Sequence, residues 1–250
     1  MRASQTIALI FVLLNCFQVN SGHAYPYHDK VNTSADSLLI VAFGNSITAE
    51  RATIEAVFAQ RLPTLLQKVG VSCTVRNAGI GGSHTGRQID HDLFKIPHAL
   101  DRLQNDVLKH KPDITIVGFG TNDAHIDANH AHGKSRIPLD NYRANLKYIV
   151  TELQRIGSGV ILIAPNCLGK NYPSFQNDRL FQYVAVVRNI AQEFRTGLVD
   201  NFALFKDYGQ VYRQDVDDLM LDGVHPNDKG HELMANNLTE VILEISNQKR

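Results

Sequence analysis

Tryptophan is absent from this chain of 250 residues, and so is an excess of charge of either sign. Without indole rings the chain lacks the strongest stacking side chain, which argues against an extended aromatic platform for sugars. Basic and acidic residues number 25 each, so nothing in the charge balance favours nucleic acid or an anionic membrane surface as a partner. With 44% hydrophobic and 20% charged residues, the composition is typical of a globular protein with one well-buried core.

Long apolar runs are also missing, apart from the N-terminus, so no later segment can span a membrane. The N-terminus has a basic start at Arg2, a mostly apolar run over Ile7–Phe17, and small residues at Gly22 and Ala24. That apolar run is too short to cross a bilayer comfortably, and the order of features is typical of a secretory signal. We therefore expect residues 1–24 to be a signal peptide that is cleaved after Ala24.

Cleavage there would leave residues 25–250 as a single domain that begins at Tyr25 and is exported to the periplasm or the extracellular space. A lipoprotein tethered through Cys16 is the alternative. It is less favoured, because Asn15 is a poor residue immediately before a lipidated cysteine.

Short β-branched runs alternate with longer amphipathic segments from about Ser37 onward. The predicted strands are Leu38–Phe43, Val71–Val75, Ile114–Phe119, Val160–Ala164 and Gly197–Val199. The predicted helices are Ala52–Val69, Pro97–His110, Asp140–Ile156, Phe175–Phe194 and Asn227–Ile245. We expect Pro63 to kink or shorten the first helix. Continuously apolar strands that alternate with helices predict one α/β domain with a parallel sheet and right-handed crossovers.

Glycine and polar side chains gather where the predicted strands end, which is where parallel sheets bind ligands. The segments are Gly44–Ser46 after the first strand, Asn77–His84 after the second, Gly120–Asp123 after the third and Leu221–Pro226 before the last helix. All four should meet at one edge of the sheet. Ser46 is also expected near a helix N-terminus, where free N–H groups favour developing negative charge.

These segments contain the parts of a serine-nucleophile site. A neutral serine hydroxyl needs an adjacent base, and His225 can take the proton of Ser46 while Asp222 fixes the tautomer of the imidazole. A tetrahedral oxyanion needs preorganised donors, each worth about 3 kcal/mol of barrier. The backbone N–H groups of Ser46 and Gly82 and the side-chain amide of Asn122 can supply them. Judged alone, Ser46 would be a helix cap, so it is the whole set of segments that favours catalysis.

The four segments resemble, in order, the sequence blocks of the SGNH hydrolases, also called the GDSL family of esterases and lipases. The matching blocks are Gly44-Asn45-Ser46-Ile47, Asn77-x-Gly-Ile-x-Gly82, Gly120-x-Asn122-Asp123 and Asp222-x-x-His225-Pro226. The resemblance implies a three-layer α/β/α, flavodoxin-like fold with a five-stranded parallel sheet of order 2-1-3-4-5. It implies no metal and no organic cofactor.

The same block matching implies a role for each residue. Ser46 is the implied nucleophile, His225 the base and Asp222 the residue that orients the base. Gly82 and Asn122 join Ser46 in the implied oxyanion hole.

One position departs from the family pattern, which usually has aspartate where this chain has Asn45. Asparagine has the same size and can bond locally, so we expect activity to survive. In an exported protein Cys73 and Cys167 would suggest a disulfide. In the implied strand order their strands are not neighbours, so we expect two free and largely buried thiols.

The segment 123–132 contains three histidines and two aspartates, which are residues that zinc accepts as ligands. We favour instead a loop that shapes the pocket, with no metal. His84, Arg87 and His125 are the candidate substrate-binding residues, and Arg136 lies in the same stretch of sequence. These basic groups could meet a polar or anionic substrate or be solvated surface charges.

The resulting hypothesis is an exported serine esterase that removes O-acetyl groups from a carbohydrate through an acyl-enzyme on Ser46. Its partner is then a small-molecule or polysaccharide ester, with no nucleic acid and no transmembrane segment involved. Three alternatives remain open from sequence: a lysophospholipase or thioesterase acting on longer acyl chains, an acyltransferase, and a non-catalytic binding module of the same fold.

Overall fold

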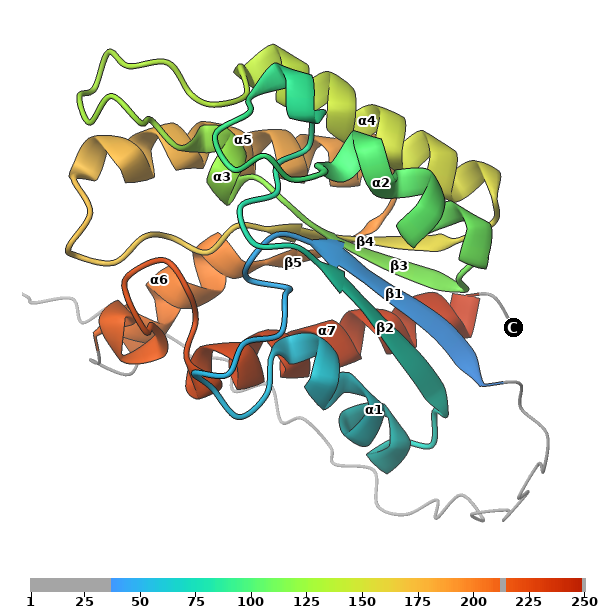
Figure 1. The fold of residues 1–250 in the computed structure, drawn as a ribbon. Coiled ribbons are helices and arrows are strands. Elements are labelled where there is room, and N and C mark those ends of the chain that lie inside the picture. Colours follow the sequence, from blue (N-terminus) through green and yellow to red (C-terminus); the bar gives the residue numbers. More distant parts are fainter. Residues whose placement is uncertain (1–36, 212–214, 249–250) are drawn as a thin grey trace, which may run out of the picture. The chain divides into compact units, whose positions relative to one another are not determined.

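The computed structural model describes residues 37–211 and 215–248, which belong to one compact α/β unit (Figure 1). The predicted signal peptide, Cys16 and the expected domain start at Tyr25 lie outside the described residues. None of the helices in the described ranges combines the length and the apolarity that a membrane span requires.

A five-stranded sheet, parallel throughout, forms the centre of this unit. Its strands are β1 (Leu38–Gly44), β2 (Cys73–Gly79), β3 (Ile114–Gly118), β4 (Gly159–Ala164) and β5 (Gly197–Asp200). Their order is β2-β1-β3-β4-β5, which confirms the expected topology. Gly44 pairs with Gly79 on one side and with Gly118 on the other, so three strands end at the same level. The segments that follow them therefore start side by side.

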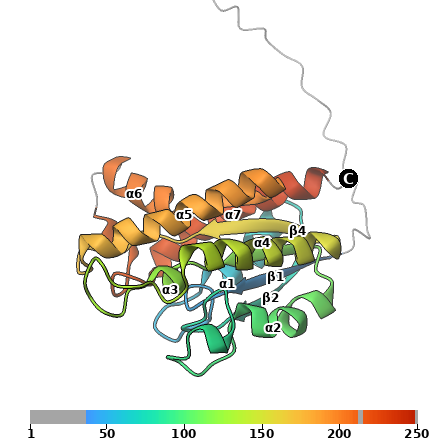
Figure 2. The same cartoon turned by 90° about the horizontal axis from the view of Figure 1, so that it is seen from above.

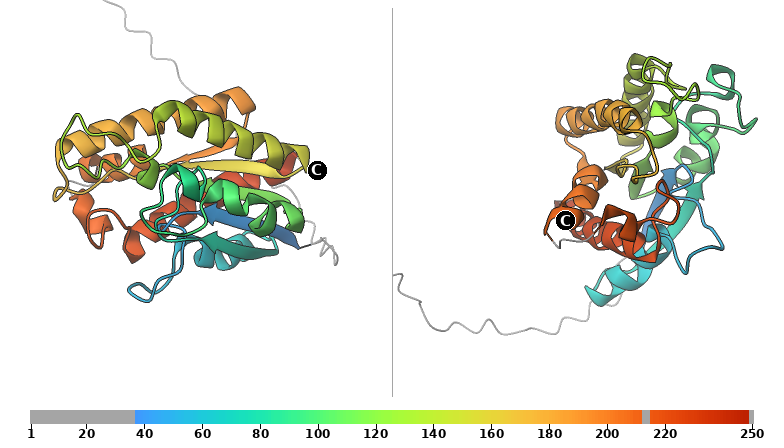
Figure 3. Two further views of the ribbon diagram at one scale, coloured as in Figure 1. Left: turned by 45° about the horizontal axis from the view of Figure 1, so that its top comes forward. Right: turned by 90° about the vertical axis from the view of Figure 1, so that its left-hand side faces the viewer.

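Helices cover both faces of the sheet and complete the expected three layers. The longer ones are α1 (Phe58–Lys68), α2 (Ala99–Asp106), α4 (Leu139–Arg155), α5 (Ser174–Phe194), α6 (Asn201–Val211) and α7 (Asp228–Gln248). Figures 1 and 3 show α2, α4 and α5 on one face and α1 and α7 on the other. Seen from above in Figure 2, α4 and α5 run side by side over the sheet.

The first helix differs from its prediction. It begins at Phe58 instead of Ala52 and continues through Pro63 to Lys68, so the proline does not end it. The late start is caused by a contact with a distant part of the chain. The N–H groups of Glu55 and Ala56 donate to the carboxylate of Asp228 at the start of α7, which holds residues 50–57 in turns.

Two helices were missed, and the second predicted helix, like the first, was too long. The short α3 (Thr121–Ala124) follows β3 directly, and α6 follows β5 without a loop. The helix predicted over Pro97–His110 is divided at Val107 into α2 and a 3₁₀ turn, Leu108–His110. Short helices of this kind depend on tertiary contacts more than on sequence periodicity.

The two cysteines within the described residues are free, as expected from the strand order. Cys167 is buried, and burial raises the pKa of its thiol to about 11. Cys73 is only half-buried, so the expectation of two largely buried thiols holds for one of them.

Arg102 of α2 ties the ends of β1 and β2 together. Its guanidinium donates to the carbonyls of Gly44 (2.7 Å) and Ala78 (2.6 Å) and to the carboxylate of Asp106 (3.0 Å). It also lies over the ring of Phe43, 4.4 Å from the centroid, and the residue is 4% exposed. Arg102 thus fixes the two strand ends from which the active-site segments begin.

Replacing Arg102 with methionine should lower the free energy of unfolding by about 3 kcal/mol, because the carbonyl of Ala78, the carbonyl of Gly44 (which keeps the N–H of Ile80) and the carboxylate of Asp106 each lose the guanidinium as a donor. Urea denaturation followed by circular dichroism measures this change. The matched control is Arg143→Met on the exposed face of α4, where the ion pair with Asp140 should be worth under about 1 kcal/mol. Equal, small effects of the two substitutions would contradict the role of Arg102.

His231 of α7 is a buried imidazole that joins α7 to the start of α1. Its Nδ1 accepts the Phe58 N–H at 3.2 Å, which requires a neutral ring. Burial, reinforced by the positive charges of Arg51 and Arg61, lowers the pKa of His231 to about 3. The ring is therefore uncharged in the folded state at neutral pH.

This depressed pKa predicts a loss of stability in acid. An unfolded histidine binds a proton below about pH 6.5, whereas His231 in the folded state does not until about pH 3. The stability contributed by the neutral ring is thus complete above about pH 6.5. It falls by at most about 1.4 kcal/mol per pH unit as the pH drops below that value. In His231→Asn, which keeps an acceptor for Phe58, urea unfolding at pH 7, 6 and 5 should show a shallower decline. Identical slopes for both proteins would count against the linkage.

Candidate active site

Ser46 lies in a tight turn directly after β1. The carbonyl of Asn45 accepts the N–H groups of Thr48 (3.1 Å) and Ala49 (3.0 Å), and its side-chain oxygen accepts that of Ile47 (2.9 Å). The next helix starts only at Phe58, so the expected helix N-terminus at Ser46 is wrong. The turn itself, which is closed by the buried side chain of Asn45, presents the hydroxyl instead.

Three side chains from opposite ends of the chain form one hydrogen-bonded series. The Oγ of Ser46 is 2.9 Å from Nε2 of His225, and Nδ1 of His225 is 2.7 Å from Oδ2 of Asp222. An ionised carboxylate only accepts hydrogen bonds, so the imidazole proton lies on Nδ1. That leaves the lone pair of Nε2 directed at the serine hydroxyl, as a general base requires.

The carboxylate of Asp222 is held in place by the backbone of the residues that follow it. Its Oδ1 accepts the N–H groups of Val224 (3.0 Å) and His225 (2.8 Å), two and three residues further along the chain. Partial burial raises the pKa of Asp222, but these two bonds and the contact with the His225 ring outweigh it and hold the pKa below its usual value. The carboxylate therefore stays ionised opposite the imidazole.

The segment after β4 is hydrogen-bonded to the loop that carries Asp222 and His225, a contact that the sequence did not predict. The N–H of Gly169 donates to the carbonyl of Gly223 (2.7 Å), and the side chain of Asn166 donates to the carbonyl of Val224 (3.0 Å). Extending the search for strand-end residues to the fourth strand would have found Asn166, because it comes two residues after Ala164.

Three donors face the same space beside Ser46. Within the part of the chain that the structure describes, the N–H groups of Ser46 and Gly82 have no protein acceptor. The Nδ2 of Asn122 donates to the carbonyl of Ser83 (2.9 Å), which leaves its second N–H available. Gly82 has φ of 78°, and a Cβ there would lie 2.8 Å from the ring of Phe94, so only glycine fits.

Asp123 of α3 anchors the segment that follows β2 by binding Thr85. Its Oδ1 accepts both the N–H (2.8 Å) and the hydroxyl (2.5 Å) of Thr85. The side chain is fully buried, and burial raises its pKa to about 6 against the opposing effect of the Thr85 bonds. This bond fixes Gly82 and Asn122 relative to each other, because Asn122 directly precedes Asp123 and Gly82 lies three residues before Thr85.

A cavity of about 480 Å³ opens over Ser46 and His225, which form a triad with Asp222. This volume is within the usual size range for a small-ligand site. The lining residues of the cavity include Ser46, His225, Gly82 and Asn122. Arg51, Phe94 and Tyr172 also line it and carried no sequence signal, because each comes from a loop whose path only the fold determines.

The three candidate substrate-binding residues have different placements. His125 lines the cavity. His84 is 1% exposed and stacks on His98 with ring centroids 3.4 Å apart, and it is not a lining residue. Arg87 is a surface residue that faces Asp101 at 3.7 Å beside a separate hollow. Of these three candidates, His125 alone lines the cavity.

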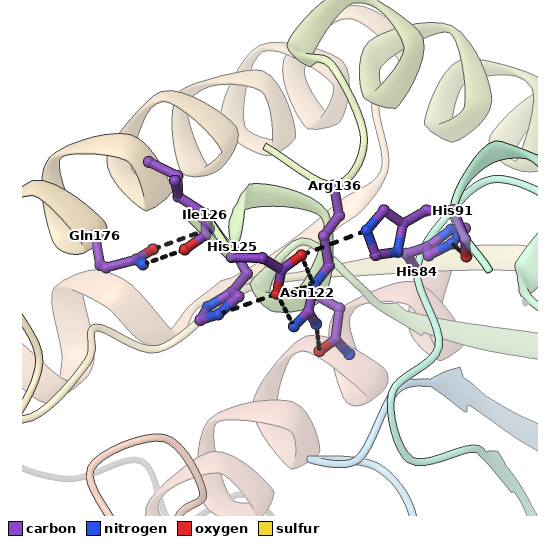
Figure 4. Close-up of polar contacts among 8 residues, drawn as sticks. His84, His91, Asn122, His125, Ile126, Arg136 and Gln176 are labelled. Atoms are coloured by element: carbon purple, nitrogen blue, oxygen red, sulfur yellow. Dashed lines mark hydrogen bonds and ion pairs between the residues drawn. The ribbon is translucent and has the colours of Figure 1, made fainter. Parts of the chain in front are cut away.

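The histidine-rich segment 123–132 shows no arrangement suited to a metal. Across residues 37–211 and 215–248, no group of three or more His, Cys, Asp or Glu side chains could hold an ion. Instead, the imidazoles of His91 and His125 flank Asp127, with Nε2–carboxylate distances of 3.4 and 3.6 Å. Asp127 in turn pairs with Arg136 at 2.6 Å. Figure 4 shows Arg136 between His125 and His91.

Comparison with known proteins places most of the chain in one family. A model described as the GDSL-like Lipase/Acylhydrolase family matches residues 42–233. An acetylxylan esterase of Geobacillus stearothermophilus is 30% identical over 135 residues. That match covers 54% of this chain and 61% of the relative, which is less than two thirds of its length.

Two further relatives are matched over more of their length. The human isoamyl acetate-hydrolyzing esterase 1 homolog is 27% identical over 219 residues, 81% of this chain and 80% of that protein. The crystal structure of an acetylxylan esterase from Geobacillus stearothermophilus has a TM-score of 0.65 and 26% sequence identity. It covers 82% of this chain and 94% of that one.

Proposed function

Because this chain belongs to the GDSL-like lipase/acylhydrolase family, we propose that it is a serine esterase that removes O-acetyl groups from a carbohydrate. The observation that carries the proposal is the unbroken series from Ser46 Oγ through the His225 ring to Asp222, with contacts of 2.9 and 2.7 Å, in which Ser46 and His225 line the cavity. A structural helix cap would need neither the base nor the carboxylate behind it.

The geometry supports a two-step acyl transfer. His225 takes the proton of Ser46 as Oγ attacks the acyl carbon, and it then protonates the departing alcohol oxygen, which leaves an acyl-enzyme. Water gives a proton to the same imidazole and attacks the acyl carbon, and the carboxylic acid leaves as Ser46 regains its proton. Asp222 stabilises the imidazolium in both steps without taking its proton.

The oxyanion of each tetrahedral intermediate would bind the N–H groups of Ser46 and Gly82 and the free N–H of Asn122. These donors are held before the reaction begins: Asn122 by Ser83, and Gly82 by the loop that Asp123 anchors through Thr85. Preorganised donors of this kind need no rearrangement when charge develops, which makes each worth about 3 kcal/mol of barrier.

Acetylated carbohydrate is favoured as the substrate for two reasons. Relatives of this chain include proteins named acetylxylan esterases. The cavity wall also combines basic groups, such as Arg51 and His125, with the rings of Phe94 and Tyr172. Rings can pack on sugar faces while the polar groups bond to hydroxyls.

The test is acetate release from acetylated xylan and acetylated pectin, together with a rate profile over nitrophenyl esters of increasing chain length. We expect acetate release and a maximum at the acetyl ester. A maximum at long chains would favour a lysophospholipase or thioesterase, and ester exchange outrunning hydrolysis when an added alcohol competes with water would favour an acyltransferase. Failure of a fluorophosphonate to label Ser46 in the folded protein would leave only a binding module.

Export by the N-terminal signal peptide remains part of the proposal and rests on the sequence of residues 1–24. The mass of the mature protein, purified from the secreting host, checks it. A first residue at Tyr25 is expected, and retention of residues 1–24 would overturn the assignment.

A further inference from the structure

The side-chain amide of Asn122 has a donor group and an acceptor group, and each has a hydrogen-bond partner. Its Nδ2 donates to the carbonyl of Ser83 at 2.9 Å, and its Oδ1 accepts from Nη1 of Arg136 at 3.5 Å (Figure 4). Turning the amide by 180° would set two carbonyl oxygens against each other and direct an NH₂ group at a guanidinium that can only donate. Only one orientation satisfies both neighbours, and it keeps the N–H groups on the side of Ser83.

Arg136 is itself held in a fixed position. Its guanidinium makes three contacts with the carboxylate of Asp127, at 2.6, 3.0 and 3.1 Å, in a forked arrangement. It also lies over the ring of Phe94, 5.1 Å from the centroid, and its side chain is only 9% exposed. Arg136 also lines the cavity, and its pairing and stacking leave its guanidinium little freedom to move from this position.

The backbone of the loop that carries Asp127 and Arg136 is anchored as well. The N–H of Arg136 donates to the carbonyl of His125 (3.0 Å), and Ile126 forms an antiparallel bridge with Ser135. Gln176 of α5 binds both backbone groups of Ile126, at 3.2 and 3.0 Å, as Figure 4 shows. Arg136 is therefore held in place by three groups of contacts: those with the segment at His125 and Ile126, the support of that segment by α5, and the ion pair with Asp127.

We propose that Arg136 is a positioning residue that fixes the amide of Asn122 for oxyanion binding, and that Asp127 holds Arg136 in register. The proposal rests on the proposed function, since it assigns a task to a neighbour of the proposed oxyanion hole. Arg136 withdraws electrons from the amide oxygen and thereby strengthens the remaining N–H as a donor to the developing oxyanion. Through Asp127, the histidine-rich segment 123–132 then helps to position the oxyanion donor, in addition to shaping the pocket.

A double-mutant cycle tests this coupling, with Arg136→Met, Asn122→Ala and the double variant assayed on nitrophenyl acetate. Arg136→Met should lower kcat about tenfold while KM stays within about threefold, and Asn122→Ala should lower kcat about 100-fold. The double variant should match Asn122→Ala, because without the amide Arg136 has nothing to position. Arg136→Lys keeps the charge but loses the fork, so it should restore only part of kcat.

The matched control is Arg179→Met. Arg179 also binds this loop, through the hydroxyl of Ser135 at 2.7 Å, but it makes no contact with Asn122. A merely structural effect of loosening the loop should appear in both arginine variants, whereas the proposed effect on kcat should be confined to Arg136.

Several outcomes would overturn the proposal. A further tenfold loss from Arg136→Met in the Asn122→Ala background would show that the two residues act independently. A raised KM with unchanged kcat would mean that Arg136 contacts the substrate. If Asn122→Ala alone leaves kcat unchanged, the oxyanion assignment fails first. If Arg136→Met does not fold, Arg136→Lys and Asp127→Asn replace it in the same cycle.

Discussion

Replacing Ser46 with alanine should lower kcat/KM for acetate release by at least about 10⁴-fold, leaving only what binding and the oxyanion donors supply. The reason is chemical: without Oγ there is no acyl-enzyme, and His225 faces a methyl group in place of a hydroxyl at 2.9 Å. The fold should be unaffected, because the turn that carries Ser46 is closed by Asn45 and by backbone bonds and not by the serine side chain. Acetate release and fluorophosphonate labelling, measured on the same preparation, check both statements.

Ser174→Ala at the exposed start of α5 is the matched control, since it removes a hydroxyl far from the triad in sequence. It should keep full activity and full labelling. Equal turnover by the Ser46→Ala protein and the unchanged protein would sink the acyl-enzyme mechanism, whatever the substrate.

Changing Asp222 to asparagine should lower kcat by about 10³- to 10⁴-fold while leaving the fold in place. Asparagine can still accept the N–H groups of Val224 and His225 through one oxygen, so the loop keeps its shape. The group opposite Nδ1 of His225 can then become a donor, which favours the tautomer with its proton on Nε2. In that tautomer the imidazole cannot take the proton of Ser46.

Asp140→Asn on α4 is the control for this substitution, because the Asp140 side chain is 90% exposed and pairs only with Arg143. It should not change kcat. Urea unfolding of Asp222→Asn separates a loss of chemistry from a loss of structure. A reduction in kcat of less than about tenfold would mean that Asp222 does not orient the base.

The sheet could be read from the sequence because its signals are local. Runs such as Gly159–Ala164 are buried on both faces and are therefore apolar throughout, and they alternate with amphipathic helices. Helix limits were harder to predict. The start of α1 depends on Asp228, which lies over 170 residues away and takes the N–H groups of Glu55 and Ala56. No window of local sequence contains that contact.

The site residues divide in the same way. Ser46, Asp222 and His225 were candidates because each occupies a fixed place in a short block and has an obvious chemical task. His84 was a candidate on residue type alone, and the structure buries it against His98. Arg136, in contrast, became informative only once its contacts with Asn122 and Asp127 were visible.

By itself, the sequence determined the strand order that the blocks imply and the identities of the groups able to act as nucleophile, base and oxyanion donors. These depend on residue type and on spacing within a few residues. Only the tertiary structure decided how those groups are supported: Arg102 across two strand ends, Asp123 on Thr85, Asn166 beneath the triad loop and Arg136 beside the amide of Asn122. Each support is a hydrogen bond between segments far apart in the chain, and such a bond forms only after hydrophobic burial has brought the segments together.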